Sequence, residues 1–274
     1  MPELPEVETL VRQLRPVLTG RRILGVHLSH DDILDGVTRR ELHQGLIGST
    51  ITGIDRRAKH ALLHTDRGIL AVQPGMSGTL MHHVGRMTTA LRQYAVLQCE
   101  LDDKSTLIYR DVRRIGTIRW VDDAGWNSYA SRLGREPLDP AFTAEQFADR
   151  MAQSASAIKK VLMNQRHVVG VGNIYANEAL FSARINPRTP ASKVSRRKLV
   201  ALHGEVRRIL QAAIDSGGST IRDYVSSAGE EGRFQQSLTV YGRGGQPCRI
   251  CGAMLATTHA IDNRATVFCR RCQR

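Results

Sequence analysis

The stretch MPELPEVE at residues 1–8 predicts the start of an amphipathic helix. Pro5 is typical of a first helical turn. Glu3 and Glu6 lie three residues apart in that turn, where unpaired backbone N–H groups favour negative charge. Apolar residues then recur at the spacing of one helix face, at Val7, Leu10, Val11, Leu14 and Leu18. On these residues alone, the stretch is an ordinary acidic helix start.

Removal of Met1 would give the same stretch a reactive group, because the amine of Pro2 would become the N-terminus. An α-amino group titrates near ~8 and a lysine near ~10, so more of the Pro2 amine is unprotonated at neutral pH. Such an amine is a nucleophile toward a sugar aldehyde carbon. Glu3 and Glu6 beside it are suited to proton transfer. This hypothesis needs support from other parts of the chain.

The C-terminal cysteines predict a structural zinc site. Cys248 and Cys251 form one Cys-x2-Cys pair, Cys269 and Cys272 form another, and seventeen residues separate the pairs. Four thiolates fill the tetrahedron of a zinc ion and leave no position for a reactive water. A disulfide framework is not expected, because no secretory signal is recognisable. The one further cysteine, Cys99, lies in an alternating apolar run typical of a core thiol.

The charge balance predicts a polyanionic partner. The 274 residues include 39 Lys and Arg against 26 Asp and Glu, for a formal charge of +13 and a pI of about 10.1. A ribosomal protein or any basic surface would give the same balance, so charge alone does not identify the partner. No apolar run approaches the roughly twenty residues of a membrane helix. We therefore expect a soluble, cytosolic protein without a membrane partner.

The pattern of the chain changes near residues 131–140, which are rich in turn residues and prolines. Before them, short apolar or alternating segments predict a β-sandwich or flattened barrel, with strands at 23–28, 50–54, 61–64, 69–73, 94–101, 106–109 and 117–121. After them, helical patterns cover 144–153, 157–164, 177–184, 196–215 and 220–226. We place a domain linker at the change.

The stretch VVGVGNIYANE at residues 168–178 lies between two expected helices. Gly170 and Gly172 permit a tight double reversal, and Asn173 is suited to hydrogen bonding at the start of the next helix. Backbone amides in such a turn can hold a phosphate. A plain corner between two helices would also explain two closely spaced glycines.

Three motifs now stand in order: PELPEVE at the N-terminus, VVGVGNIYANEALF in the middle, and CxxC…CxxCQR at the end. Together they closely resemble the bacterial formamidopyrimidine-DNA glycosylase family over essentially the whole length. The resemblance implies an α+β multidomain fold. Its parts would be an N-terminal β-sandwich with an opening helix (1–135), a helix-two-turns-helix domain (136–236) and a C-terminal zinc finger hairpin (237–274).

The resemblance also implies a function in base excision repair. Members of the family excise oxidised purines, such as 8-oxoguanine and formamidopyrimidines, from duplex DNA through an imine at the N-terminal proline. β,δ-Elimination then cuts the strand. We therefore expect a glycosylase and AP lyase with one structural zinc ion. It would act as a monomer on double-stranded DNA with oxidised bases or abasic sites, in the cytoplasm at the nucleoid.

The catalytic residues of the family fall on five positions. Pro2 matches the nucleophile, Glu3 its acid and base partner, and Glu6 a further acid of the opening helix. Lys59, in RRAK, matches a lysine that contacts phosphate or donates a proton. Without the resemblance it would be a solvated lysine on a strand. Arg264 matches the finger arginine that grips phosphates at the lesion and assists the second elimination.

The DNA contacts of the family fall on seven further positions. Gly172, Asn173 and Lys159 match phosphate contacts. Met76 and Arg113 match the side chains that fill the gap left by the extruded base. The match also implies that Arg113 reads the orphaned base and favours cytosine. The other two positions, Ile115 and Arg92, depart from the family pattern.

These departures limit what the resemblance carries over. Ile115 stands where an aromatic residue is expected, and it stacks less well on a base. Gln73 and Pro74 replace a usual His-Leu, and residues 153–157 lack an expected basic run, which puts phosphate contacts in doubt. Arg92 replaces a common histidine and would compensate. Residues 219–234 match a cap that folds over the extruded base.

Two alternatives stay open. The sister family, endonuclease VIII, acts on oxidised pyrimidines, but it begins PEGPE, with glycine where this chain has Leu4. A non-enzymatic lesion-binding or architectural DNA protein on the same fold is the second. The joint presence of Pro2, Glu3, Lys59 and Arg264 argues against it.

Overall fold

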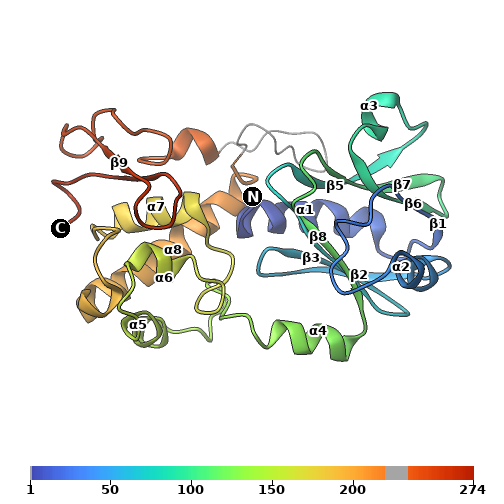
Figure 1. Cartoon of the computed structure of the whole chain (residues 1–274), viewed down its shortest axis with the longest axis horizontal. Helices are drawn as coiled ribbons and strands as arrows, with labels where there is room; N and C mark the ends of the chain where they lie inside the picture. Colours follow the sequence, from blue (N-terminus) through green and yellow to red (C-terminus); the bar gives the residue numbers. More distant parts are fainter. Residues whose placement is uncertain (1, 220–233) are drawn as a thin grey trace. The chain divides into compact units, whose positions relative to one another are not determined.

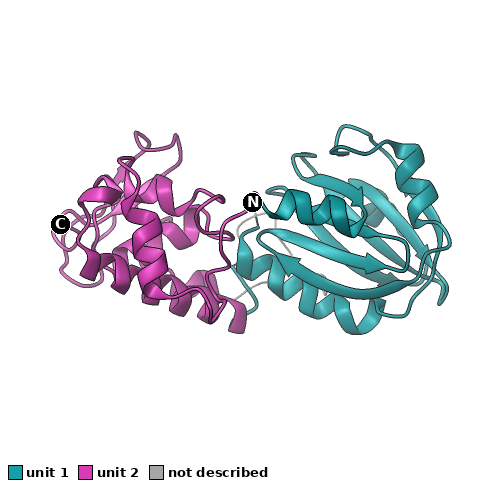
Figure 2. Ribbon diagram, turned by 90° about the horizontal axis from the view of Figure 1, so that it is seen from below, with its two compact units in different colours: residues 1–131, 216–233 teal, residues 132–215, 234–274 magenta. Residues whose placement is uncertain are grey.

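The computed structural model describes residues 2–219 and 234–274, which form two compact units (Figure 2). Unit 1 comprises residues 1–131 with 216–233, and unit 2 comprises residues 132–215 with 234–274. The chain therefore leaves unit 1 and returns to it before it ends in unit 2. The three functional domains expected from the sequence stay a prediction.

Unit 1 contains two four-stranded antiparallel sheets (Figure 1), which confirms the predicted β-sandwich. One sheet has the order β1 (Ile23–Leu28), β6 (Ala95–Leu101), β7 (Ser105–Asp111) and β5 (Gly78–Val84). The other has the order β2 (Ile51–Arg57), β3 (His60–Thr65), β4 (Ile69–Gln73) and β8 (Thr117–Val121). The predicted bounds of β1, β4 and β8 agree with the structure.

The opening helix α1 (Leu4–Leu18) contributes its apolar stripe to the core shared by both sheets. All five predicted core residues of this helix are buried, which confirms the predicted apolar face. Cys99 on β6 is also fully buried, and burial raises the pKa of its thiol to about 12. It is a core residue, as predicted.

Within residues 2–131 of unit 1, three helices and one strand were not predicted. They are α2 (Arg39–Leu46), α3 (Thr89–Arg92), α4 (Asp123–Ala130) and β5. Helix α2 is polar, and only Leu42 and Leu46 are buried, but Thr38 and Glu41 form a capping box that the sequence displays. Asp122 likewise caps α4 by accepting a hydrogen bond from Gly125 N–H.

Unit 2 is helical, with a small two-stranded sheet near the C-terminus. Its helices are α5 (Ala144–Ala152), α6 (Ile158–Leu162), α7 (Asn173–Ser182) and α8 (Arg196–Asp215), with short 3₁₀ turns η1 (Ala191–Lys193) and η2 (Phe234–Ser237). Strands β9 (Ala256–Thr258) and β10 (Thr266–Phe268) pair antiparallel.

Helix α8 has the predicted bounds, whereas α7 begins four residues before the predicted Asn177. Gly172 serves as its N-cap, and Ile174 and Tyr175, in the added turn, are buried. The helix expected at 220–226 lies outside the described residues. Among the helices that the structure describes, none is long and apolar enough to cross a membrane.

The environment of His60 predicts a pH dependence of stability. This residue is buried against the rings of Trp126 and Tyr129, with centroid distances of 5.7 and 5.4 Å. Burial lowers the pKa of His60 from 6.5 to about 4. As the pH falls, His60 takes up a proton near pH 6.5 in the unfolded chain but only near pH 4 in the folded chain. The free energy of unfolding therefore decreases as the pH falls from about 6.5 to about 4.

We expect this effect to reach roughly 3 kcal/mol near pH 4, from about 1.4 kcal/mol per pKa unit. Urea unfolding at a series of pH values measures it. The His60→Gln variant removes the titrating group and keeps a donor for Tyr129, whose hydroxyl lies 3.2 Å from His60 Nε2. Its unfolding free energy should vary less between pH 7 and pH 4 than that of the parent. Identical pH profiles would refute the assignment.

Candidate functional site

The first residues of the chain are held at the start of α1. Pro2 and Glu3 are both buried, and Glu3 is the N-cap rather than a member of the first turn. The backbone N–H of Glu3 donates to Glu6 Oε2 at 2.9 Å. The position of Glu3 is thus fixed by the second acid of the motif, three residues further along the helix.

The other oxygen of Glu6 binds a distant segment of the same unit. Ser219 donates to Glu6 Oε1 from its backbone N–H and its hydroxyl, at 2.8 Å each. The preceding Gly218 has φ +82°, and a Cβ there would lie 3.3 Å from Glu6 Cγ. One carboxylate therefore ties Ser219 to the N-terminal motif. Residues 220–233 of the expected cap, which spans 219–234, lie outside the described residues.

Lys59 lies in the tight turn between β2 and β3. The strands pair up to Arg57 and His60, and Ala58 takes the left-handed conformation with φ +56°. Arg56 donates to the Ala58 carbonyl at 3.0 Å and to Glu8 Oε2 at 2.8 Å. The turn that carries Lys59 is therefore fastened to α1, the helix that begins beside Pro2.

The ion pairs of Glu8 support this attachment. Burial acts to raise the pKa of Glu8, but hydrogen bonds from Arg56 and Arg12 outweigh it and lower the pKa below its usual value. Glu8 therefore keeps its negative charge at neutral pH. Arg56 is the more enclosed partner, with a side chain 10% exposed.

Asp111 organises the loops that carry the expected gap-filling residues. Its buried carboxylate accepts hydrogen bonds from Ser77 Oγ at 2.7 Å, Tyr109 Oη at 3.1 Å and Gly116 N–H at 2.9 Å. Burial and the Asp111 charge both raise the pKa of Tyr109 well above its usual value. The loop after β4 and the loop after β7 are thereby joined.

Met76, Arg113 and Ile115 lie on these two joined loops. Met76 is 41% exposed and Ile115 is 51% exposed, so neither belongs to the core. The backbone N–H of Arg113 donates to Ser77 Oγ at 3.1 Å. All three were predicted from the sequence, whereas Asp111 was not, because its partner Ser77 lies 34 residues away.

Arg92 lies at the end of α3. It lines a cavity of about 540 Å³ with His27, Gln98 and Glu100, beside strands β1 and β6. No other predicted site residue lines this cavity.

In unit 2, Asn173 connects the start of α7 to the finger hairpin. Its side-chain amide donates to the Ala265 carbonyl at 3.1 Å, next to the exposed Arg264. Lys159, expected to contact phosphate, is instead fully buried. It donates to Thr266 Oγ1 at 2.7 Å and pairs with Asp262 at 3.3 Å.

Glu178 on α7 holds the chain where it enters the finger. Its buried carboxylate accepts from the backbone N–H groups of Thr239, Val240 and Tyr241 at 2.8, 2.9 and 2.8 Å. The hydroxyl of Thr239 adds a fourth hydrogen bond. No role for Glu178 was predicted from the sequence.

The four predicted ligands Cys248, Cys251, Cys269 and Cys272 come together, with their Sγ atoms all within 4.8 Å of one another. Cys248 Sγ lies 3.9 Å from Cys272 Sγ, and Cys251 Sγ lies 3.5 Å from Cys269 Sγ. Zinc–sulfur bonds of about 2.3 Å in a tetrahedron require sulfur separations near ~3.8 Å. The cluster could therefore hold a metal ion.

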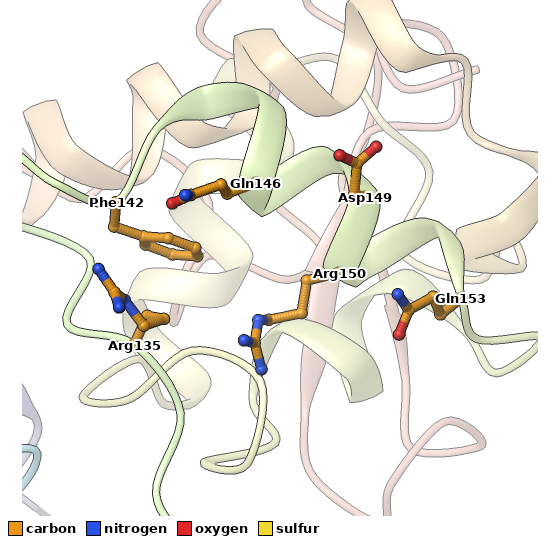
Figure 3. Close-up of a pocket in the computed structure, with 6 residues that line it drawn as sticks. All are labelled: Arg135, Phe142, Gln146, Asp149, Arg150 and Gln153. Atoms are coloured by element: carbon orange, nitrogen blue, oxygen red, sulfur yellow. The ribbon is translucent and has the colours of Figure 1, made fainter.

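A further cavity of about 390 Å³ lies on α5 and holds none of the predicted residues. Arg135 lies over the Phe142 ring, 5.9 Å from its centroid, and Arg150 extends from α5 (Figure 3). Asp149 pairs with Arg196. The predicted site residues thus lie on loops and helix ends, not in this cavity.

Comparison with known proteins agrees with this arrangement. The model of the formamidopyrimidine-DNA glycosylase N-terminal domain matches residues 1–118, and that of the formamidopyrimidine-DNA glycosylase H2TH domain matches residues 133–225. A formamidopyrimidine-DNA glycosylase of Xanthomonas campestris pv. campestris (strain B100) is 45% identical over 276 residues, which covers 100% of both chains.

Solved structures show the same similarity. A Lactococcus lactis FPG mutant in complex with Fapy-dG containing DNA has a TM-score of 0.91 and 31% identity, with 100% of both chains covered. Lactococcus lactis Fpg with abasic site containing DNA has a TM-score of 0.90 and 31% identity, with 99% of both chains covered. The chain belongs to the formamidopyrimidine-DNA glycosylase family.

Proposed function

We propose that this protein excises oxidised purines from duplex DNA and cleaves the resulting abasic site, in base excision repair. The observation that carries the proposal is the N-terminal geometry: Pro2 precedes an N-cap glutamate whose backbone is held by a second glutamate. Relatives of this chain have been solved with Fapy-dG containing DNA and with abasic site containing DNA. Such an enzyme would bind these two kinds of DNA one after the other.

The amine of Pro2 attacks C1′ of the damaged nucleotide, and the bond from C1′ to the base breaks. Glu3 transfers the proton that accompanies opening of the sugar ring and departure of the base. The nitrogen–carbon double bond that forms at Pro2 acidifies the sugar hydrogens, so the phosphates leave by β- and then δ-elimination. Pro2 is released when the imine is hydrolysed.

Basic side chains and the turn before α7 would hold the DNA. Lys59, Gly172, Asn173 and Arg264 are proposed phosphate contacts, and Arg264 also assists the second elimination. Lys159 supports this contact from inside unit 2, through its bonds to Thr266 and Asp262. Glu6 holds Ser219 beside the catalytic pair.

Met76, Arg113 and Ile115 would fill the gap left by the extruded base, because they are carried together on the loops joined by Asp111. Isoleucine offers less stacking area than an aromatic residue, so Met76 and Arg113 carry more of this task. Arg92 would contact phosphate further along the duplex.

The cysteine cluster would hold one zinc ion, which when bound crosslinks the finger. The proposed domain boundaries are 1–135, 136–236 and 237–274. We further propose that the protein acts as a monomer in the cytoplasm, at the nucleoid.

Replacement of Glu3 separates the two activities. Glu3→Gln should lower excision of 8-oxoguanine by about a hundredfold or more, because it removes the proton-transfer group. An abasic site already carries an aldehyde, so the variant should keep strand cleavage and borohydride trapping on abasic duplex. A tag before Pro2 should abolish both activities, since an amide nitrogen has no usable lone pair.

The matched control is Glu145→Gln, an exposed acid in the first turn of α5 that should behave as the parent does. Excision by Glu3→Gln at the parent rate would disprove the assigned role. Absence of any borohydride crosslink between the parent and lesion DNA would favour the non-enzymatic alternative.

Loss of one thiolate should release the metal and weaken DNA binding without unfolding unit 1. Both tryptophans, Trp120 and Trp126, lie in unit 1, so their emission reports that unit alone. Cys251→Ala should contain less zinc than the parent by elemental analysis, bind duplex poorly, and retain the parent emission spectrum. Cys99→Ala, outside the cluster, should keep its zinc. Active parent protein without zinc would reject the proposal.

Arg113 should set the preference for the opposite base. Arg113→Gln is expected to reduce discrimination between cytosine and the other bases opposite the lesion by roughly tenfold, since a bidentate contact discriminates by about 1–3 kcal/mol. Affinity for undamaged duplex should change less. Competition binding with four matched duplexes measures both effects, and equal losses for all four would contradict the role.

A further inference from the structure

Arg264 lies in the seven-residue loop between β9 and β10, where the backbone reverses sharply. Asn263 takes a left-handed conformation with φ +58°, and its N–H donates to the His259 carbonyl at 3.0 Å. The Arg264 side chain is exposed. Its direction therefore depends on what holds the backbone of this loop.

Contacts hold the loop on the C-terminal side of Arg264. The Ala265 carbonyl accepts from Asn173 at 3.1 Å, and Val267 N–H donates to Asn177 Oδ1 at 2.8 Å. Asn173 and Asn177 are one turn apart on α7, so this helix fixes the strand that follows Arg264.

Asp262 holds the loop on the N-terminal side. Its Oδ1 accepts from the backbone N–H of Arg264 at 3.2 Å, the pattern of a local Asx turn. The same oxygen lies 3.3 Å from Lys159 Nζ, and Oδ2 lies 3.4 Å from it. One carboxylate thus joins α6 to the backbone of Arg264.

The Lys159–Asp262 pair is enclosed. The Lys159 side chain is 0% exposed and the Asp262 side chain is 14% exposed. A buried ammonium is strongly disfavoured without an anionic partner, so Asp262 is confined to a narrow range of positions. Thr266 Oγ1, 2.7 Å from Lys159 Nζ, completes the contact with β10.

We propose that Asp262 is a positioning residue that aims Arg264 at DNA phosphate, by joining the buried ammonium of Lys159 to the Arg264 backbone. The inference rests on the proposed function of Arg264. The expected change in DNA affinity on removal of the Asp262 charge is opposite in direction to the simple electrostatic one. A carboxylate beside a phosphate-binding loop should by simple electrostatics weaken DNA binding, whereas a positioning role means that its removal weakens binding.

Equilibrium binding to a duplex with an uncleavable abasic analogue tests the direction of this change in affinity. Asp262→Asn keeps the size of the side chain and its acceptor for the Arg264 N–H, but removes the negative charge beside the Lys159 ammonium. We expect roughly a five- to tenfold weaker affinity, although the variant gains one positive charge. The control Asp149→Asn, at an exposed acid of the same unit, should bind as tightly as the parent or tighter.

A double-mutant cycle with Arg264→Ala identifies the path of the effect. Once Arg264 is absent, Asp262→Asn should cost little more. Each single variant should reduce the magnitude of the slope of log affinity against log salt by about 0.9, the value for one lost phosphate contact. The zinc content and tryptophan emission of each variant show whether both units are intact.

If Asp262→Asn loses zinc, the pair Lys159→Met with Asp262→Asn, which leaves no buried charge, is measured instead with the same expectation. Unchanged or tighter binding by these variants would overturn the proposal, as would an equal loss with and without Arg264. A loss of affinity in Lys159→Met alone, with none in Asp262→Asn, would mean that Lys159 contacts phosphate itself. Because this is a binding measurement, it is independent of whether the parent excises a base.

Discussion

A buried carboxylate must be met by hydrogen-bond donors, and this constraint shapes much of the proposed site. Desolvation makes an unpaired carboxylate costly, so whichever chain segment supplies the donors is held in place. Asp111 joins the loops after β4 and β7 by hydrogen bonds. Glu6 accepts from the backbone of residues 3 and 219, and Glu178 accepts from the backbone of residues 239–241. Met76, Arg113 and Ile115 lie on loops, and Asp111 supplies there the order that secondary structure does not.

The same constraint affects the surface charge. Acids that are buried and hydrogen-bonded to neutral backbone donors do not pair with surface cations, so the excess of 39 basic over 26 acidic residues is larger on the outside than the composition suggests. Asp262 is a different case, because its partner is a buried lysine and the pair is neutral. Long-range attraction of a polyanion and fixed local geometry are therefore provided by separate groups.

Local signals in the sequence predicted the parts of the fold that depend on periodicity or spacing. The stripe of α1, the bounds of α8 and the cysteine cluster are of this kind. Helix α2 was not predicted because it buries only two leucines. The predicted start of α7 was too late because Gly172 caps this helix without a side chain. Asp111, Glu178 and Asp262 bind partners that are 34, 62 and 103 residues away, respectively, so no local pattern reveals these contacts.

The bonds between Glu6 and Ser219 also bear on the order in which the protein is made. Residues 1–131 supply both sheets of unit 1 and leave the ribosome first, whereas the donors of Ser219 follow more than two hundred residues after Glu6. Domains generally fold as units during synthesis, starting from the N-terminal side. The sandwich can therefore assemble early, but the N-terminal site reaches its final form only after most of unit 2 has been translated. A nascent chain released before that point would carry Pro2 and Glu3 without the completed surroundings that direct them.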